Sequence, residues 1–183
     1  MSKTSEKLTS CQTNEHYTPT SFLSKVSNFF HNQIDLDPSS NSKVAPQVPA
    51  RLHYTAEENG LSLPWYGNTF CNPPYGRVCP HFVDKAIAEY EDHPNELEIL
   101  MLLKSATDTR WYQKLARYPR CNILGRLKFE SADGTQTKPA TFPSVLFFLG
   151  NRVEEFWEFW ESMGEIVIPI GLMPKIEAEK NRI

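Results

Sequence analysis

The feature that most constrains the fold of this 183-residue chain is an almost unbroken apolar run at residues 97–103, where Glu98 is the only polar side chain. A strand with apolar residues on both sides must be covered on both, as happens inside a sheet that carries helices on each face. Strand-like segments alternate with helix-like segments before and after this run. The sequence therefore predicts an α/β fold with a largely parallel sheet and helices on both faces.

The neighbouring segments supply the other elements of this sheet. Further strands are predicted at residues 33–37, 51–55, 68–71, 121–129, 144–149 and 165–170. Helices are predicted to begin at Pro19, with Thr18 as the N-cap, and at Pro80, and to span residues 107–118 and 154–163. The last helix and strand are expected to close the sheet as an antiparallel edge.

Length and composition indicate one compact domain. Residues 17–174 are expected to form it, between a polar tail at residues 1–16 and a charged tail at residues 175–183. No apolar run approaches the roughly 18 residues of a membrane span, and the first residues lack the apolar core of a signal peptide. We therefore expect a cytoplasmic protein with no membrane partner.

The cysteines give no sign of a disulfide framework or a metal site. The chain has four, at Cys11, Cys71, Cys79 and Cys121, and no two of them form a Cys-x-x-Cys pair. Without a secretion signal they are expected to be reduced thiols. Two of these cysteines lie near His81 and His93 in the sequence, but the spacing matches no zinc pattern, so no metal is expected.

A stiff loop, Asn72-Pro73-Pro74-Tyr75, follows the predicted strand at residues 68–71. Two consecutive prolines fix φ and remove two backbone donors, so the strand must end there. Ligands of open α/β sheets bind at the carboxyl ends of the strands. The Asn72 amide oxygen and the Pro73 carbonyl can accept both hydrogens of an amino group, and Tyr75 can stack on the heterocycle that carries it. The alternative is a plain proline-rich turn.

A second strand end carries the acidic turn Asp35-Leu36-Asp37-Pro38-Ser39. If its strand lies beside the one that ends at residue 71, both loops open on the same edge of the sheet. The acidic side chains could then accept hydrogen bonds from an amino acid or from ribose hydroxyls, although an Asx or Ser turn is the alternative. Glycine-rich dinucleotide motifs, P-loops and nucleophile elbows are absent from the sequence.

Charge is distributed unevenly along the chain. The net charge is −3, which argues against a strongly basic nucleic-acid binder, yet residues 104–138 hold eight basic and only three acidic side chains. A basic segment on an acidic body suggests one surface that meets phosphate groups. A solvated helix face is the other interpretation.

Several segments together resemble the phage-type, Dam-like DNA N6-adenine methyltransferases. They are Tyr17-Thr18-Pro19, Asp35-Leu36-Asp37-Pro38, the Trp65-x-Gly67 lead-in to Cys71-Asn72-Pro73-Pro74-Tyr75-Gly76, Gly125-Arg126-Leu127-Lys128-Phe129, and Phe142-Pro143-Ser144. The resemblance runs in order from about residue 15 to residue 150. It implies a Rossmann-like methyltransferase sheet, S-adenosylmethionine as the methyl donor and DNA as the partner. The host would be a bacterial cell, with the gene encoded by a phage or prophage.

The resemblance also assigns roles to residues. The catalytic residues would be Asn72, Pro73, Pro74 and Tyr75, which would hold the N6 amino group of an adenine flipped out of the duplex. The cofactor-binding residues would be Tyr17, Thr18, Pro19, Asp35, Asp37, Pro38, Ser39 and Thr55. Candidate phosphate contacts are Arg110, Arg126 and Lys128. The turn departs from the usual pattern, because Ser39-Ser40-Asn41 stands where many methyltransferases have glycines, which places more weight on Asp35 or Asp37.

Two other functions agree with the same sequence features. The Asn-Pro-Pro-Tyr motif also serves methylation of cytosine N4, of adenine in RNA or of protein glutamine. A catalytically silent DNA-binding partner could be built on the same scaffold, although its motif would then be expected to carry damage. Residues 130–142 form the one long loop left to read bases, so we expect a short or relaxed sequence preference.

Overall fold

The computed structural model describes residues 17–130 and 139–172, so the predicted tails at residues 1–16 and 175–183 lie outside the described residues. The strands are β1 (Ile34–Asp37), β2 (Ala50–His53), β3 (Gly67–Cys71), β4 (Leu97–Lys104), β5 (Arg120–Ile123), β6 (Ser144–Leu149) and β7 (Gly164–Val167). The helices are α1 (Thr20–Phe29), α2 (Cys79–Asp92), α3 (Arg110–Leu115) and α4 (Val153–Trp160), with 3₁₀ turns η1 (Glu161–Met163) and η2 (Ile170–Leu172). None of the helices described is long and apolar enough to cross a membrane.

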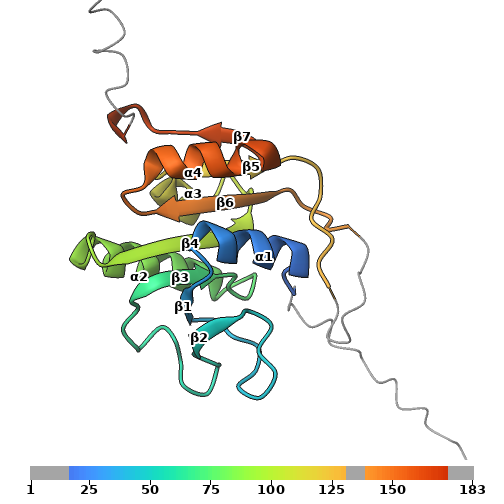
Figure 1. Ribbon diagram of the computed structural model, residues 1–183, viewed down its shortest axis with the longest axis vertical. Coiled ribbons are helices and arrows are strands. Elements are labelled where there is room, and N and C mark those ends of the chain that lie inside the picture. The colour runs from blue at the N-terminus through green and yellow to red at the C-terminus, as the bar shows by residue number, and fades with distance from the viewer. Residues whose placement is uncertain (1–16, 131–138, 173–183) are drawn as a thin grey trace, which may run out of the picture.

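Strand β4 is the centre of the core. The side chains at positions 97, 99, 101 and 103 are buried on one face of the sheet together with apolar residues of α2 and α3. Leu100 and Leu102 are fully buried on the other face, against α1 and α4 (Figure 1). The prediction of a strand covered on both faces, within an α/β fold, is confirmed.

The seven strands form a single sheet with a parallel and an antiparallel half. Its order is β2-β1-β3-β4-β6-β5-β7. The first four strands in this order pair in parallel, whereas β6 pairs antiparallel with β4 and with β5. Strand β7 is the antiparallel edge that was expected. The parallel half is therefore smaller than the sequence suggested. It contains β1 and β3, which lead into the turn after Asp37 and the loop that begins at Asn72.

The start of α1 differs from the prediction. Pro19 is the N-cap and provides no side-chain hydrogen bond to the helix. Thr18 is 1 % exposed, and its hydroxyl bonds to Asn72 instead of the helix. The backbone N–H of Thr20 instead donates to Glu130 Oε1 at 2.8 Å, and the Thr20 hydroxyl donates to Glu130 Oε2 at 3.0 Å. A helix N-terminus must satisfy its free N–H groups, and here a carboxylate 110 residues away does so. Local sequence rules cannot predict a cap of this kind.

Helix α3 and strands β5 and β7 are also shorter than predicted. Helix α3 begins at Arg110 because the Thr109 hydroxyl accepts the N–H of Tyr112 and caps the helix there. Strand β5 ends at Ile123, shortly before Gly125 turns the chain with φ of +77°. Strand β7 ends at Val167, and the residues after it form η2.

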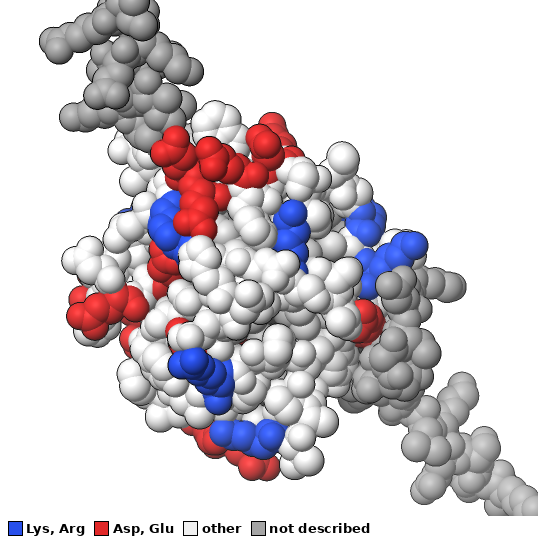
Figure 2. Space-filling model, in the orientation of Figure 1, with Lys and Arg blue, Asp and Glu red and all other residues white. Residues whose placement is uncertain are grey.

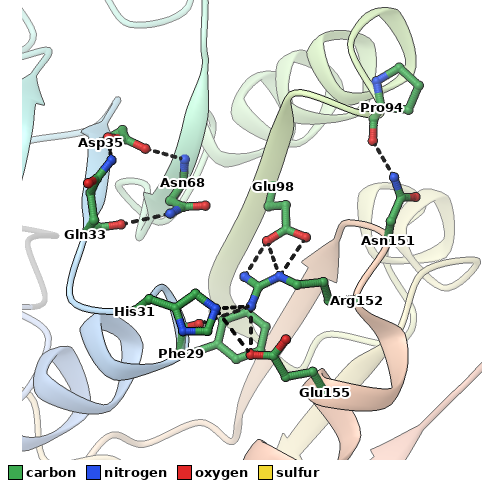
Figure 3. Close-up of polar contacts among 10 residues, drawn as sticks. All are labelled: Phe29, His31, Gln33, Asp35, Asn68, Pro94, Glu98, Asn151, Arg152 and Glu155. Carbon is green, nitrogen blue, oxygen red and sulfur yellow. Dashed lines mark hydrogen bonds and ion pairs between the residues drawn. The ribbon is translucent and has the colours of Figure 1, made fainter.

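Arg152, just before α4, connects α4, β4 and α1 at the amino ends of the parallel strands (Figure 3). Its guanidinium donates from Nε and a terminal nitrogen to Glu98 at the start of β4. The other terminal nitrogen donates to the Phe29 carbonyl at 3.3 Å and to Glu155 at 2.8 Å. The side chains of Arg152 and Glu98 are only 27 % and 19 % exposed, so this pair is better shielded from water than a surface salt bridge.

We expect Arg152→Met to lower the free energy of unfolding by about 2–3 kcal/mol, because it leaves Glu98 partly buried without its partner. Urea denaturation would measure the change. Lys114→Met is the matched control, since the Lys114–Asp84 pair is about half exposed and should cost less than ~1 kcal/mol. Equal losses in the two variants would contradict the prediction.

Candidate active site

The two loops singled out in the sequence meet at one edge of the sheet. Strands β1 and β3 are parallel neighbours, with Leu36 paired to Thr69. The chain therefore leaves both strands at the same edge, after Asp37 and after Cys71. The condition under which both loops open on one edge, that these two strands lie side by side, is therefore met.

A cavity of about 760 Å³ lies between these loops. Of the predicted catalytic and cofactor-binding residues, nine line it: Tyr17, Thr18, Asp37, Pro38, Ser39, Thr55, Asn72, Pro73 and Pro74. The other three, Pro19, Asp35 and Tyr75, do not. Its volume is within the range of about 300–1,000 Å³ that is usual for sites that bind small molecules.

Thr18 connects the N-terminal segment to the proline loop. Its hydroxyl accepts a hydrogen bond from Asn72 Nδ2 at 3.0 Å, although the two residues are 54 positions apart. The Thr18 backbone is held by Gln47, whose amide accepts from the Thr18 N–H at 2.9 Å and donates to the Thr18 carbonyl at 2.6 Å. These bonds fix the plane of the Asn72 amide at the wall of the cavity. Pro19 does not line the cavity and is the N-cap of α1.

Asp37 is the buried acid of the site. It is 2 % exposed, and burial raises its pKa to about 6, although the N–H of Ser39, which donates to the carboxylate at 3.1 Å, opposes this rise. The Ser39 hydroxyl also lies 3.7 Å from the Cys71 sulfur. Burial raises the pKa of Cys71, so that it remains a thiol. A buried carboxylate at a cavity wall can receive a cationic group.

Asp35 lies outside the cavity and joins β1 to β3 through a hydrogen bond. It precedes Asp37 by two positions, so it lies on the same side of β1 but about 6.6 Å further from the strand end. Its oxygens accept from Gln33 Nε2 at 2.7 Å and from the Asn68 N–H at 2.9 Å (Figure 3). Gly67 approaches so closely that a Cβ there would lie 2.4 Å from Asp35 Oδ2. Of the two acids predicted to serve the cofactor, Asp37 therefore lines the cavity and Asp35 does not.

Several cavity residues carry no signal in the sequence. Gln47, Glu57 and Gly60 line the cavity, and all three come from the irregular stretch between β1 and β3. Thr55 is held by Glu58, which accepts both its N–H and its hydroxyl. Glu57 places a second carboxylate at the cavity, where it could accept hydrogen bonds from hydroxyl groups. Its position next to Thr55, just beyond β2, was the one feature that could have suggested it.

Tyr75 does not line the cavity, and its ring belongs to an aromatic cluster. It is 7 % exposed, and its ring meets Phe142 and Phe129 edge-on, with centroids 5.3 Å and 6.5 Å apart. Lys104 Nζ lies 5.0 Å from the Tyr75 ring centroid, and burial raises the pKa of the Tyr75 hydroxyl. Tyr75→Ala would remove a packed ring and leave a void, so this variant would change stability as well as activity.

The basic segment contains paired and unpaired side chains. Lys114 of α3, and Arg117 just after this helix, pair with Asp84 and Glu91 of α2. Arg110, Arg126 and Lys128 are exposed and form no ion pair within the described residues. Figure 2 shows acidic side chains gathered over α4 and β7, where Glu154, Glu158, Glu161 and Glu165 are exposed. Arg110, Arg126 and Lys128 are therefore better candidates for contacts with phosphate groups than the other basic residues of the segment.

No three His, Cys, Asp or Glu side chains in the described ranges gather closely enough to hold a metal ion. A comparison with curated proteins finds no match. A family model described as DNA N-6-adenine-methyltransferase (Dam) matches residues 5–165, a span that includes both loops and every residue of the cavity wall. The chain therefore belongs to the DNA N-6-adenine-methyltransferase (Dam) family.

Proposed function

We propose that the protein transfers a methyl group from S-adenosylmethionine to the N6 atom of an adenine that has been flipped out of DNA. Membership of the Dam family supports adenine methylation in general. The observation that carries the finer proposal is the Asn72 amide, held by Thr18 at the wall of a cavity of about 760 Å³. This arrangement puts an oriented hydrogen-bonding group next to a space large enough for a cofactor.

The donors and acceptors of the cavity suit S-adenosylmethionine. The buried Asp37 carboxylate can hold a cationic group. Glu57 and Thr55 offer oxygen atoms to the hydroxyls of a ribose. When bound, this cofactor supplies a methyl group on a positively charged sulfur, which leaves as a neutral thioether.

The residues of the proline loop would prepare the target nitrogen. The N6 lone pair of adenine is delocalised into the ring and is a poor nucleophile. Asn72 Oδ1 and the Pro73 carbonyl would each accept one N6 hydrogen, which favours a pyramidal nitrogen whose lone pair points toward the cavity. Alignment of this kind contributes more to the rate than a strong base would, and the proton released from N6 passes to solvent.

The target adenine must leave the duplex to reach this loop, because its N6 atom is inaccessible inside the base stack. Tyr75 lies next to Asn72, Pro73 and Pro74 and would offer its ring to the extruded base. Arg110, Arg126 and Lys128 are exposed and would contact phosphate groups on either side.

The affinity for S-adenosylmethionine should depend on the ionisation of Asp37. Because its pKa is about 6, the carboxylate is largely protonated at pH 5 and ionised at pH 7.5. A cationic ligand favours the ionised form, so Kd should fall as the pH rises through 6 and then level off. We expect roughly a tenfold change between pH 5 and pH 7.5, measured by calorimetry. Asp37→Asn should bind more weakly and lose this pH dependence; an unchanged pH profile in the variant would contradict the assignment.

Methyl transfer from labelled cofactor tests the proposal directly. The protein is incubated with unmethylated duplex DNA, and the DNA is digested to nucleosides. N6-methyldeoxyadenosine is the expected product. N4-methyldeoxycytidine, or label on RNA or protein alone, would support one of the other amino-group substrates. Absence of S-adenosylmethionine binding in calorimetry would instead support a catalytically silent DNA-binding protein.

A further inference from the structure

Lys104 is the last residue of β4 and lies beside the proline loop. Strand β4 is the parallel neighbour of β3, with Met101 paired to Cys71. The chain therefore reaches Lys104 at the edge of the sheet where Asn72 and Tyr75 follow β3. The sequence placed Lys104 in the basic segment but gave it no role of its own.

The ammonium group of Lys104 lies against two aromatic rings. Its Nζ is 5.0 Å from the centroid of Tyr75 and 4.3 Å from the centroid of Phe142. These two rings meet edge-on, with centroids 5.3 Å apart, so the cation sits where both rings can contact it. Tyr75 is the ring that would receive the target base.

The charge of Lys104 has no acidic partner in the part of the chain that the structure describes. Lys43, Lys85 and Lys114 each pair with a carboxylate, whereas no Asp or Glu oxygen in the described residues lies within 4.0 Å of Lys104 Nζ. Lys104 is nevertheless half-buried. A half-buried cation without a carboxylate, at the rim of a site for a polyanion, is suited to bind a phosphate group.

We propose that Lys104 binds the phosphate of the target nucleotide, and that its ammonium covers the Tyr75 ring only until the base takes that place. This inference rests on the proposed function. As the adenine stacks on Tyr75, the ammonium moves from the ring to the phosphate that accompanies the base. The exchange replaces a cation–π contact with a base–aromatic stack and a charge-assisted hydrogen bond, both of which are available only when DNA is bound.

Lys104→Met tests the exchange, because methionine keeps an unbranched stem without the charge. Binding is measured by fluorescence anisotropy with a labelled duplex of about 20 base pairs in which one adenine faces an abasic site and is easily extruded. The slope of log Kd against log salt should decrease by about 0.9, the value that corresponds to one phosphate contact in duplex DNA. Lys104→Arg should keep the wild-type slope, and Lys114→Met, whose charge is paired with Asp84, should keep it as well.

A fully paired duplex of the same length that contains only G·C pairs locates the contact. On this probe the slope of Lys104→Met should stay close to wild type, because no target adenine can enter the site. An equal decrease on both probes would place the contact outside the target nucleotide, and an unchanged slope on the extruded adenine would show that Lys104 binds no phosphate. Either result overturns the inference.

Two further measurements separate this inference from the proposed function and from a fold defect. If the wild-type protein transfers no methyl group, the proposed function fails, and the slope on the extruded-adenine probe still tests Lys104. If Lys104→Met is unstable in urea denaturation, Lys104→Gln replaces it as the neutral variant. The slope of log Kd against log salt on the extruded-adenine probe then tests the inference in the same way. If the wild-type protein methylates DNA but Lys104→Met shows the wild-type slope, the proposed function stands and only the inferred role of Lys104 is rejected.

Discussion

Replacing Asn72 with alanine is expected to lower the rate of methyl transfer at least about 100-fold, the scale seen when one oriented hydrogen-bonding group is removed from an active site. The amide oxygen would no longer accept an N6 hydrogen, so the nitrogen would stay conjugated with the ring. The fold should persist, because removal of the 3.0 Å hydrogen bond between Asn72 and Thr18 costs about 1 kcal/mol. Single-turnover transfer from labelled cofactor measures the rate.

Two variants control this experiment. Asn72→Asp keeps an oxygen that accepts hydrogen bonds and should retain more activity than Asn72→Ala. Asn151→Ala removes an amide whose bonds run to the Pro94 carbonyl and the Tyr90 hydroxyl (Figure 3 shows the former). It should leave the rate unchanged, because neither partner lines the cavity. An Asn72→Ala protein that methylates DNA at the wild-type rate would rule out the proposed role of the amide.

Gly60→Ala is expected to have the second largest effect, on the cavity itself. A Cβ at this position would lie 2.0 Å from the Pro38 carbonyl oxygen and 3.3 Å from Tyr54 Cβ. The Gly60 carbonyl also accepts the indole N–H of Trp65 at 2.8 Å, so the segment cannot move away without breaking that bond. The turn after Asp37 must then shift. We expect a loss of about 1–3 kcal/mol in the free energy of unfolding and at least roughly tenfold weaker cofactor binding.

Urea denaturation and calorimetry with S-adenosylmethionine measure these two effects. Gly171→Ala is the matched control, because a Cβ there meets no atom within 4 Å and Gly171 lies outside the cavity lining. It should match the wild type in both measurements. Wild-type stability and affinity in Gly60→Ala would show that the turn yields easily and that its position does not matter for the cofactor.

Much of the fold could be predicted from the sequence because the strongest patterns are local. The apolar run that became β4 and the helical spacing in α1 and α2 reflect burial, which periodicity reports directly. Strand direction depends on the neighbour with which a strand pairs, and this is a tertiary property. The antiparallel half of the sheet, which begins at β6, was therefore only partly predicted.

The candidate site was predictable to the extent that its residues belong to short motifs. The meeting of the turn after Asp37 with the Asn72 loop follows from the rule for strand ends. Gln47 and Glu57 come from an irregular stretch without periodicity, so no motif or spacing marks them, and only the position of Glu57 next to Thr55 points to it. The contacts of Asp35 and the burial of Tyr75 depend on residues distant in sequence, such as Asn68 and Phe142, and local patterns do not contain that information.

The carboxylate of Glu130 has a consequence for how the two halves of the site respond to their ligands. It anchors the start of α1 through Thr20, and the Glu130 backbone N–H donates to the Tyr17 carbonyl at 2.8 Å. Its neighbour in sequence, Phe129, packs against Tyr75, whereas Tyr17 lines the cavity. Glu130 thus connects a segment that lines the cavity with the ring cluster around Tyr75. Under the proposed function, S-adenosylmethionine binds in the cavity and the target base at Tyr75, so any change that one ligand causes in the affinity of the other must be matched by an equal factor in return.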